Sequence, residues 1–181
     1  RKVLSDLIEQ QGLDLVDYNI VHFDSPDKRG IDCGLIYDAK CFSVKKTEKL
    51  TVRLPRNRHF KTRDILYVNG LFSGDVEAHV FVNHWSSRRE GTEETEHKRV
   101  QAAEVLRDKI DEIYAQDENA NIIIIGDFND YPNNNSLVKV LLAKGTMGGD
   151  TDLVNLMFDD FLQGKGTSVH QRKWIVMHAI R

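Results

Sequence analysis

Two apolar runs about forty residues apart constrain the fold of this chain more than any other feature. The first run ends in Val80-Phe81-Val82-Asn83-His84-Trp85, and the second ends in Ile122-Ile123-Ile124-Ile125-Gly126-Asp127-Phe128-Asn129-Asp130. A helical pattern separates them, which is typical of a strand, a crossover helix and a second strand. Such a unit pairs two parallel strands by a right-handed connection and places their carboxyl ends at one edge of a sheet. We therefore expect His84, Asp127 and Asn129 to lie close together at that edge, where open α/β sheets place their chemistry.

Composition bounds the classes of protein that the chain can represent. Its 181 residues carry a net charge of −3, so no global basic field points to nucleic acid or to an anionic membrane. No linker-like stretch divides the sequence, and we expect one domain over residues 1–181. The longest aliphatic run has four residues, far short of the roughly 20 that span a bilayer. Cys33 and Cys41 show no metal or disulfide spacing, which favours two buried free thiols.

The rest of the sequence predicts a short helix followed by a series of strands. Helical spacing of apolar residues predicts a helix over residues 1–11, ended by Gly12. Short segments rich in β-branched and aromatic residues then predict six strands, over residues 18–23, 31–37, 42–47, 49–54, 64–69 and 76–83.

A long helix is predicted over residues 93–115, with Thr92 as its N-cap and an apolar stripe along one face. The isoleucine run follows and reads as a central strand that is buried on both faces. Beyond it we expect a short helix over 136–143, a helical turn over 152–158 and a weak last strand at 174–177.

The two strand ends carry side chains that suit phosphoester hydrolysis. Asp127 and Asn129 can hold a water molecule, because the carboxylate accepts its proton while the amide fixes its direction. His84 can donate a hydrogen bond to a phosphoryl oxygen and stabilise charge that develops in the transition state.

The pair of motifs Asn83-His84-Trp85-x-Ser87 and Gly126-Asp127-Phe128-Asn129-Asp130 resembles the endonuclease/exonuclease/phosphatase superfamily, in a bacterial type of member. Arg29-Gly30-Ile31-Asp32 and Thr62-Arg63-Asp64-Ile65-Leu66-Tyr67 occur in the expected order. The resemblance implies a deoxyribonuclease I-like α/β sandwich of two mixed sheets with outer helices. It also implies a hydrolase that uses Mg²⁺ or Mn²⁺, with His84, Asp127 and Asn129 as catalytic residues. Arg63, and with less support Arg29, would contact substrate phosphate.

The resemblance also exposes two departures near the ends of the chain. The family's first metal site uses an Asn and a Glu from strands that would precede Arg1, so the principal Glu ligand is absent and the sandwich is expected to be incomplete at its N-terminal end. Asp127 and Asn129 are then the remaining candidate metal ligands. At the other end the family has Asp followed by His or Gln. The matching positions here are His178-Ala179, or Met177-His178 in the shifted register.

Several alternatives stay open on the sequence. The nuclease or phosphodiesterase interpretation competes with a phosphomonoesterase, acting on inositol phosphates or lipid head groups, and with a non-catalytic domain that binds phosphate weakly. Arg29 and Asp32 could pair structurally, and Asp130 could assist a metal or simply form a turn. Arg88 and Arg89 are expected in a solvated loop, and Asn83 is expected to shape the chain near His84. We expect Trp85 and Trp174 in the core and a monomeric protein; the compartment is left open.

Overall fold

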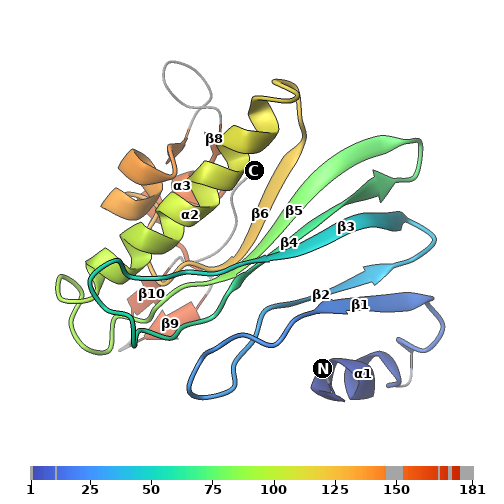
Figure 1. Ribbon diagram of the computed structural model, residues 1–181, viewed down its shortest axis with the longest axis horizontal. Helices are drawn as coiled ribbons and strands as arrows, with labels where there is room; N and C mark the ends of the chain where they lie inside the picture. Colours follow the sequence, from blue (N-terminus) through green and yellow to red (C-terminus); the bar gives the residue numbers. More distant parts are fainter. Residues whose placement is uncertain (1, 11, 146–152, 167, 171–172, 176–181) are drawn as a thin grey trace.

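A four-stranded mixed sheet forms the centre of the molecule in the computed structural model, which describes residues 2–10, 12–145, 153–166, 168–170 and 173–175 (Figure 1). Its order is β3-β4-β5-β6, formed by β3 (Phe42–Leu50), β4 (Ile65–Phe72), β5 (Val76–His84) and β6 (Ile122–Asp127). Pairing is antiparallel from β3 to β5, whereas β5 and β6 are parallel. The helix α2 (Glu96–Tyr114) connects β5 to β6, so the predicted strand–helix–strand unit is confirmed.

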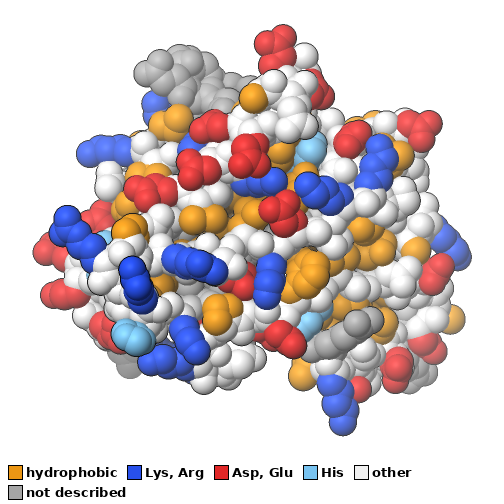
Figure 2. Space-filling view, in the orientation of Figure 1, with side chains coloured by type: hydrophobic (Ala, Val, Ile, Leu, Met, Phe, Trp, Pro, Cys, Tyr) orange, Lys and Arg blue, Asp and Glu red, His pale blue; other side chains and the backbone are white. Residues whose placement is uncertain are grey.

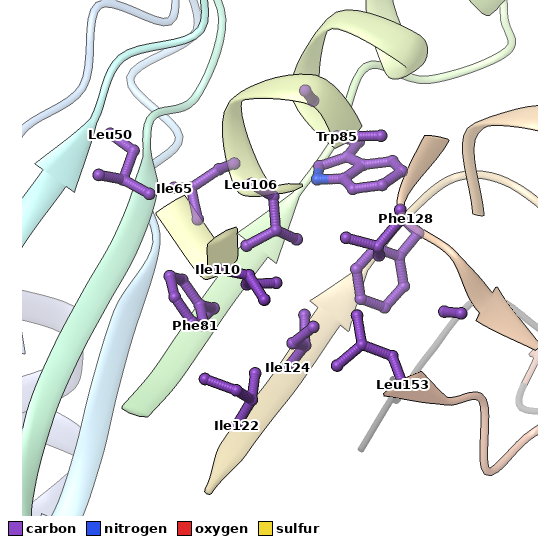
Figure 3. Close-up of a cluster of buried hydrophobic side chains, with 14 of the residues drawn as sticks. Leu50, Ile65, Phe81, Trp85, Leu106, Ile110, Ile122, Ile124, Phe128 and Leu153 are labelled. Atoms are coloured by element: carbon purple, nitrogen blue, oxygen red, sulfur yellow. The ribbon is translucent and has the colours of Figure 1, made fainter. Parts of the chain in front are cut away.

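Apolar side chains cover both faces of this sheet. On one face, Tyr67, Phe81 and Ile124 pack with Leu106 and Ile110 of α2 in the larger core cluster (Figure 3). On the opposite face, the hairpin of β1 (Tyr18–His22) and β2 (Gly34–Asp38) covers a second cluster built on the alternate residues of the same strands. The period-two alternation of strand side chains explains why neighbouring residues enter different clusters. This second layer agrees with the predicted sandwich.

Smaller elements complete the described chain. The helix α1 (Lys2–Ile8) precedes β1, and a π-helical turn, η1 (Ser136–Val140), follows β6. The short strands β7 (Ala143–Lys144) and β8 (Leu153–Val154) pair in parallel, ahead of the helix α3 (Phe158–Leu162). The strands β9 (Ser168–His170) and β10 (Lys173–Ile175) pair in antiparallel fashion. No helix of the described segments is long and apolar enough to cross a membrane.

The structure corrects several expected elements. The two strands predicted at 42–47 and 49–54 are one strand, β3, because an irregularity between Val44 and Lys46 changes the alternation without ending the pairing. The isoleucine strand β6 is covered on both faces, and β5 is its only neighbour among the described strands. The helical turn predicted at 152–158 is also wrong, because residues 153–154 form β8 and α3 begins at Phe158.

Two local predictions fail for identifiable reasons. The N-cap position of α2 is Thr95 and not Thr92, because residues 92–95 form a turn before the helix. Thr95 makes no side-chain capping bond; its hydroxyl donates to the Gly91 carbonyl oxygen and accepts from Arg99 Nη1 at 2.7 Å. Cys33 is a buried free thiol as expected, whereas Cys41 is exposed because it follows the turn that leaves β2.

Candidate functional site

The carboxyl ends of β5 and β6 bring the predicted catalytic residues together. His84 and Asp127 are register partners at the last positions of the two parallel strands. The pairing continues beyond the strands, since the Trp85 backbone N–H donates to the Asp127 carbonyl oxygen at 2.8 Å. Main-chain pairing of the two strands therefore brings both residues to the same edge of the sheet.

The Asp127-Phe128-Asn129 segment turns sharply because each of its ends is held. The Asn129 backbone N–H donates to Asp127 Oδ1 at 2.9 Å, and the Asn129 side-chain amide donates to the Trp85 carbonyl oxygen at 3.1 Å. Asn129 has a φ of 51°, a left-handed conformation that asparagine tolerates better than most residues. The Asp-x-Asn spacing is thus an ordinary turn former that also gathers a carboxylate and an amide at the site.

Gly126 is required by the close approach of the two strands. Its φ is 128°, and a Cβ at this position would lie 1.9 Å from the carbonyl oxygen of Asn83. Only glycine allows the chain to pass there and to place Asp127 beside His84.

The core beneath the site anchors the turn from below. Trp85 is buried and meets the Phe128 ring edge to face, with the ring centroids 4.9 Å apart (Figure 3). Asn83 is also buried and accepts a hydrogen bond from the Trp85 indole N–H at 3.0 Å. Asn83 therefore shapes the chain around His84, as predicted, and Trp85 lies in the core. The Trp174 side chain and His178 lie outside the described parts of the structure.

Burial is the main influence on the protonation of His84. It lowers the pKa of the imidazole, and the nearby guanidinium groups of Arg63 and Arg29 lower it further, against the opposing effects of Asp127 and Asp27. The imidazole is therefore mainly neutral near pH 7, where it still carries one N–H that can donate to an anionic oxygen.

Arg63 lies in the interior, in contrast to the prediction that it contacts substrate. Its side chain is only 4% exposed and pairs with the carboxylate of Asp27, with Nη1 3.0 Å from Oδ2. Its Nε–H donates to the His84 carbonyl oxygen at 2.9 Å, and Nη2 donates to the carbonyl oxygen of Trp85. A guanidinium in this position holds the backbone and has little surface left to offer a ligand.

Arg29 remains a candidate for phosphate contact. Its side chain is half-exposed, with Nε 3.4 Å from Asp27 Oδ1, and its charge lowers the pKa of His84. The suggested pairing of Arg29 with Asp32 is wrong. Asp32 instead accepts from the backbone N–H and hydroxyl of Ser25, each at 2.8 Å, and lies 3.2 Å from His22.

Both carboxylate oxygens of Asp130 already contact other side chains, so neither is available as a metal ligand. The carboxylate is 1% exposed and forms an ion pair with the fully buried Arg99 of α2 at 2.7 Å. Arg88 approaches the same oxygen at 3.3 Å, and the Ser136 hydroxyl donates to the other oxygen at 2.6 Å. This network attaches the loop that carries Asn129 to α2. Sequence reasoning missed it, and Arg88 is not the solvated residue that was expected.

The donor set at the site suits a hard divalent cation. Asp127 contributes a carboxylate and Asn129 an amide oxygen, and both are ligand types that Mg²⁺ and Mn²⁺ accept. Mg²⁺ commonly takes one or two carboxylates and completes its shell with water and substrate phosphate. A second group, His22, Asp24 and Asp32, has ligand atoms within 4.8 Å of one another, but Asp32 already serves Ser25 and His22.

Comparisons with known proteins agree with this architecture. Residues 1–180 match the model of the Endonuclease/Exonuclease/phosphatase family. No curated protein matches the chain significantly by sequence.

Solved structures with the same fold include a catalytic domain with bound sulfate, a sugar phosphatase and a complex with a DNA product. The human Nocturnin catalytic domain with bound sulfate aligns with a TM-score of 0.66 at 15% identity, over 99% of this chain and 63% of that one. The mannosyl-6-phosphatase Bt3783 of Bacteroides thetaiotaomicron gives 0.65 at 16% identity, over 98% and 66%. TDP2 of D. rerio with a single-stranded DNA product gives 0.60 at 13% identity, over 98% and 65%. The chain thus spans less than two thirds of the length of these structures.

Proposed function

Because the chain belongs to the endonuclease/exonuclease/phosphatase family, we propose that its site hydrolyses a phosphodiester by direct attack of water on phosphorus. One observation carries the proposal: His84 and Asp127 are register partners on parallel strands, and Asn129 is tied to both strand ends. This arrangement supports a site in which a proton acceptor, an orienting amide and a hydrogen-bond donor come from neighbouring positions at one edge of the sheet. In-line displacement at phosphorus needs these three groups.

The roles of the residues follow from their chemistry. Asp127 accepts a proton from the attacking water while the Asn129 amide orients it, and the new oxygen–phosphorus bond forms as the bond to the leaving oxygen breaks. The neutral imidazole of His84 donates its N–H to a phosphoryl oxygen and stabilises the added negative charge. A divalent cation held by Asp127 and Asn129 supplies Lewis-acid stabilisation of phosphoryl oxygens when bound.

A basic segment favours a polyanionic substrate such as a nucleic-acid strand over a small phosphomonoester. The segment between β3 and β4 carries four exposed cations, Arg53, Arg56, Arg58 and Lys61, and leads directly into Arg63. The segment runs on the left of the molecule in Figure 1, and Figure 2 shows Lys and Arg side chains on that side, with Asp and Glu side chains among them. Cations arranged along one segment can follow successive phosphates, whereas a single phosphate would need fewer.

The proposal is tested by titrating Mg²⁺ and Mn²⁺ into the folded protein while hydrolysis of a single-stranded oligonucleotide and of a phosphomonoester is measured. We expect metal-dependent cleavage of the oligonucleotide, lost in both His84→Ala and Asp127→Ala. His97→Ala and Asp108→Ala are matched controls, because they remove the same side chains from the exposed face of α2. Absence of turnover at every metal concentration, from a folded sample, would contradict the proposal. Turnover of the monoester alone would assign the site to a phosphatase.

Binding of the oligonucleotide in the presence of Ca²⁺ gives a separate measure of the basic segment. We expect the logarithm of affinity to fall linearly with the logarithm of salt concentration, and the slope to decrease by about one for each cation that contacts a phosphate and is replaced by glutamine. An unchanged slope in the variant that lacks Arg53, Arg56, Arg58 and Lys61 would remove this segment from the substrate path.

A further inference from the structure

Arg63 binds two backbone carbonyls at the end of β5. The strand β5 ends at His84, so these carbonyls belong to its last residue and to the residue that follows it, Trp85. The guanidinium donates to both of them, from Nε and from Nη2. Its five N–H groups lie in one rigid plane, which lets a single side chain reach two successive carbonyls and a carboxylate. Lysine could not reproduce this set, because its ammonium is a single point charge.

The Trp85 carbonyl oxygen joins Arg63 to the other half of the site. The same oxygen accepts the side-chain amide of Asn129 at 3.1 Å. An amide whose N–H₂ end is fixed in this way has its oxygen end fixed as well, since the group is planar. Because the Trp85 backbone N–H also binds the Asp127 carbonyl oxygen, one peptide segment connects Arg63 with all three proposed catalytic residues.

Asp27 holds the guanidinium in place and compensates its buried charge. The pair is secluded, with side-chain exposures of 4% for Arg63 and 6% for Asp27. Arg29 closes the far side of Asp27, through its backbone N–H at 3.0 Å and its Nε–H at 3.4 Å. Burial alone would raise the pKa of Asp27, but the hydrogen bonds from Arg63 and Arg29 outweigh it and lower the pKa below its ordinary value. Asp27 therefore stays ionised wherever the protein is folded near neutral pH.

We infer that Arg63 is a positioning residue for phosphoester hydrolysis, which sets the His84 backbone and the Asn129 amide without touching the substrate. This inference rests on the proposed function. It assigns the arginine of the Thr62-Arg63-Asp64 segment to the interior of the site, with Asp27 as its partner from a segment 36 residues away.

The kinetic test compares Arg63→Lys with Lys40→Gln, which removes an exposed cation from the turn between β2 and β3. Loss of the guanidinium contacts in Arg63→Lys should displace the catalytic residues by a fraction of an ångström. We therefore expect kcat to fall about 10–100-fold while KM changes less than about twofold. Asp27→Asn leaves Arg63 present but loosely held, and we expect a smaller fall of kcat in the same direction. Lys40→Gln should leave kcat unchanged. A rise in KM with unchanged kcat in Arg63→Lys would show that Arg63 binds substrate and would overturn the inference.

A second readout does not depend on activity. The side-chain amide of Asn129 gives a pair of proton–nitrogen NMR signals, which can be assigned by their loss in Asn129→Asp. We expect these signals to shift in Arg63→Lys and in Asp27→Asn, while the Asn129 signals of Lys40→Gln remain at their wild-type positions. Unchanged Asn129 signals in a folded Arg63→Lys protein would overturn the inference even if the wild type lacks turnover. If the wild type shows no turnover but the Asn129 signals shift in Arg63→Lys and in Asp27→Asn, only the proposed function is refuted.

Discussion

Replacement of Gly126 by alanine measures how strongly the parallel register controls the site. The φ of 128° at this position costs a residue with a Cβ about 1–3 kcal/mol. The new Cβ would also lie 1.9 Å from the Asn83 carbonyl oxygen, so the strands must separate by roughly 1 Å in a close-packed region. Overpacking of this kind adds about 1–3 kcal/mol. We expect a total loss of about 2–6 kcal/mol in the free energy of unfolding.

Gly74 provides a matched control for the backbone contribution. Its φ is 90°, and an added Cβ would meet no heavy atom within 4 Å. Gly74→Ala therefore carries a dihedral cost of about 1 kcal/mol without a clash. Urea unfolding followed by circular dichroism gives both values. Equal losses of stability in Gly126→Ala and Gly74→Ala would refute the claim that the Asn83 carbonyl excludes a side chain at Gly126.

The same two variants separate stability from geometry at the site. Separation of β5 from β6 by roughly 1 Å moves Asp127 relative to His84, which can lower the rate of hydrolysis about 10²-fold. Gly74→Ala lies at the opposite end of β5 and should retain the wild-type rate. A folded Gly126→Ala protein with the wild-type rate would show that the register does not set the catalytic arrangement.

Three further predictions concern single side chains. Burial raises the pKa of the Cys33 thiol to about 11, so Cys33 should not react with a disulfide reagent at pH 8 in the native protein, whereas exposed Cys41 should react. Reaction of two thiols per chain without denaturant would contradict this. Arg99→Met should lower the free energy of unfolding by about 3–5 kcal/mol, because it leaves the Asp130 charge buried, and Arg99→Met/Asp130→Asn should lose less; equal losses would contradict the ion pair. Because the folded pKa of Asp27 lies below the ordinary 3.8, its stabilisation is present above that pH and is lost as the pH falls through the lowered value. The difference in unfolding free energy between the wild type and Asp27→Asn should accordingly become smaller in acid. A constant difference would refute the claim that ionised Asp27 stabilises the fold.

The sequence predicts the part of the fold whose signals are local. The crossover unit could be predicted because β5, α2 and β6 each carry a clear periodic pattern, and parallel pairing follows from the connection. The expectation that His84 and Asp127 lie close together follows from this connection, and the structure adds that they are register partners. The strand count over residues 42–54 could not be predicted, because the irregularity near Val44 depends on pairing with β4.

Contacts that set the role of Arg63 are invisible in the sequence. Its partners lie 21, 22 and 36 residues away along the chain, and no local pattern links them. An arginine that precedes a strand has the same appearance whether it faces substrate, solvent or the interior. The buried pair of Arg99 and Asp130 is similar, because Arg99 occupies a helix whose pattern predicts only an amphipathic face.

The parallel pairing of β5 with β6 also has a consequence for the order of events during folding. The hairpin β4–β5 closes a connection of three residues and β3–β4 one of fourteen, whereas the connection from β5 to β6 includes the whole of α2. Contacts that are distant in sequence form more slowly, because a larger loop must be closed first. We therefore expect recovery of hydrolysis after dilution from denaturant to lag behind recovery of the antiparallel pairing. The proposed site forms only when β6 has paired with β5.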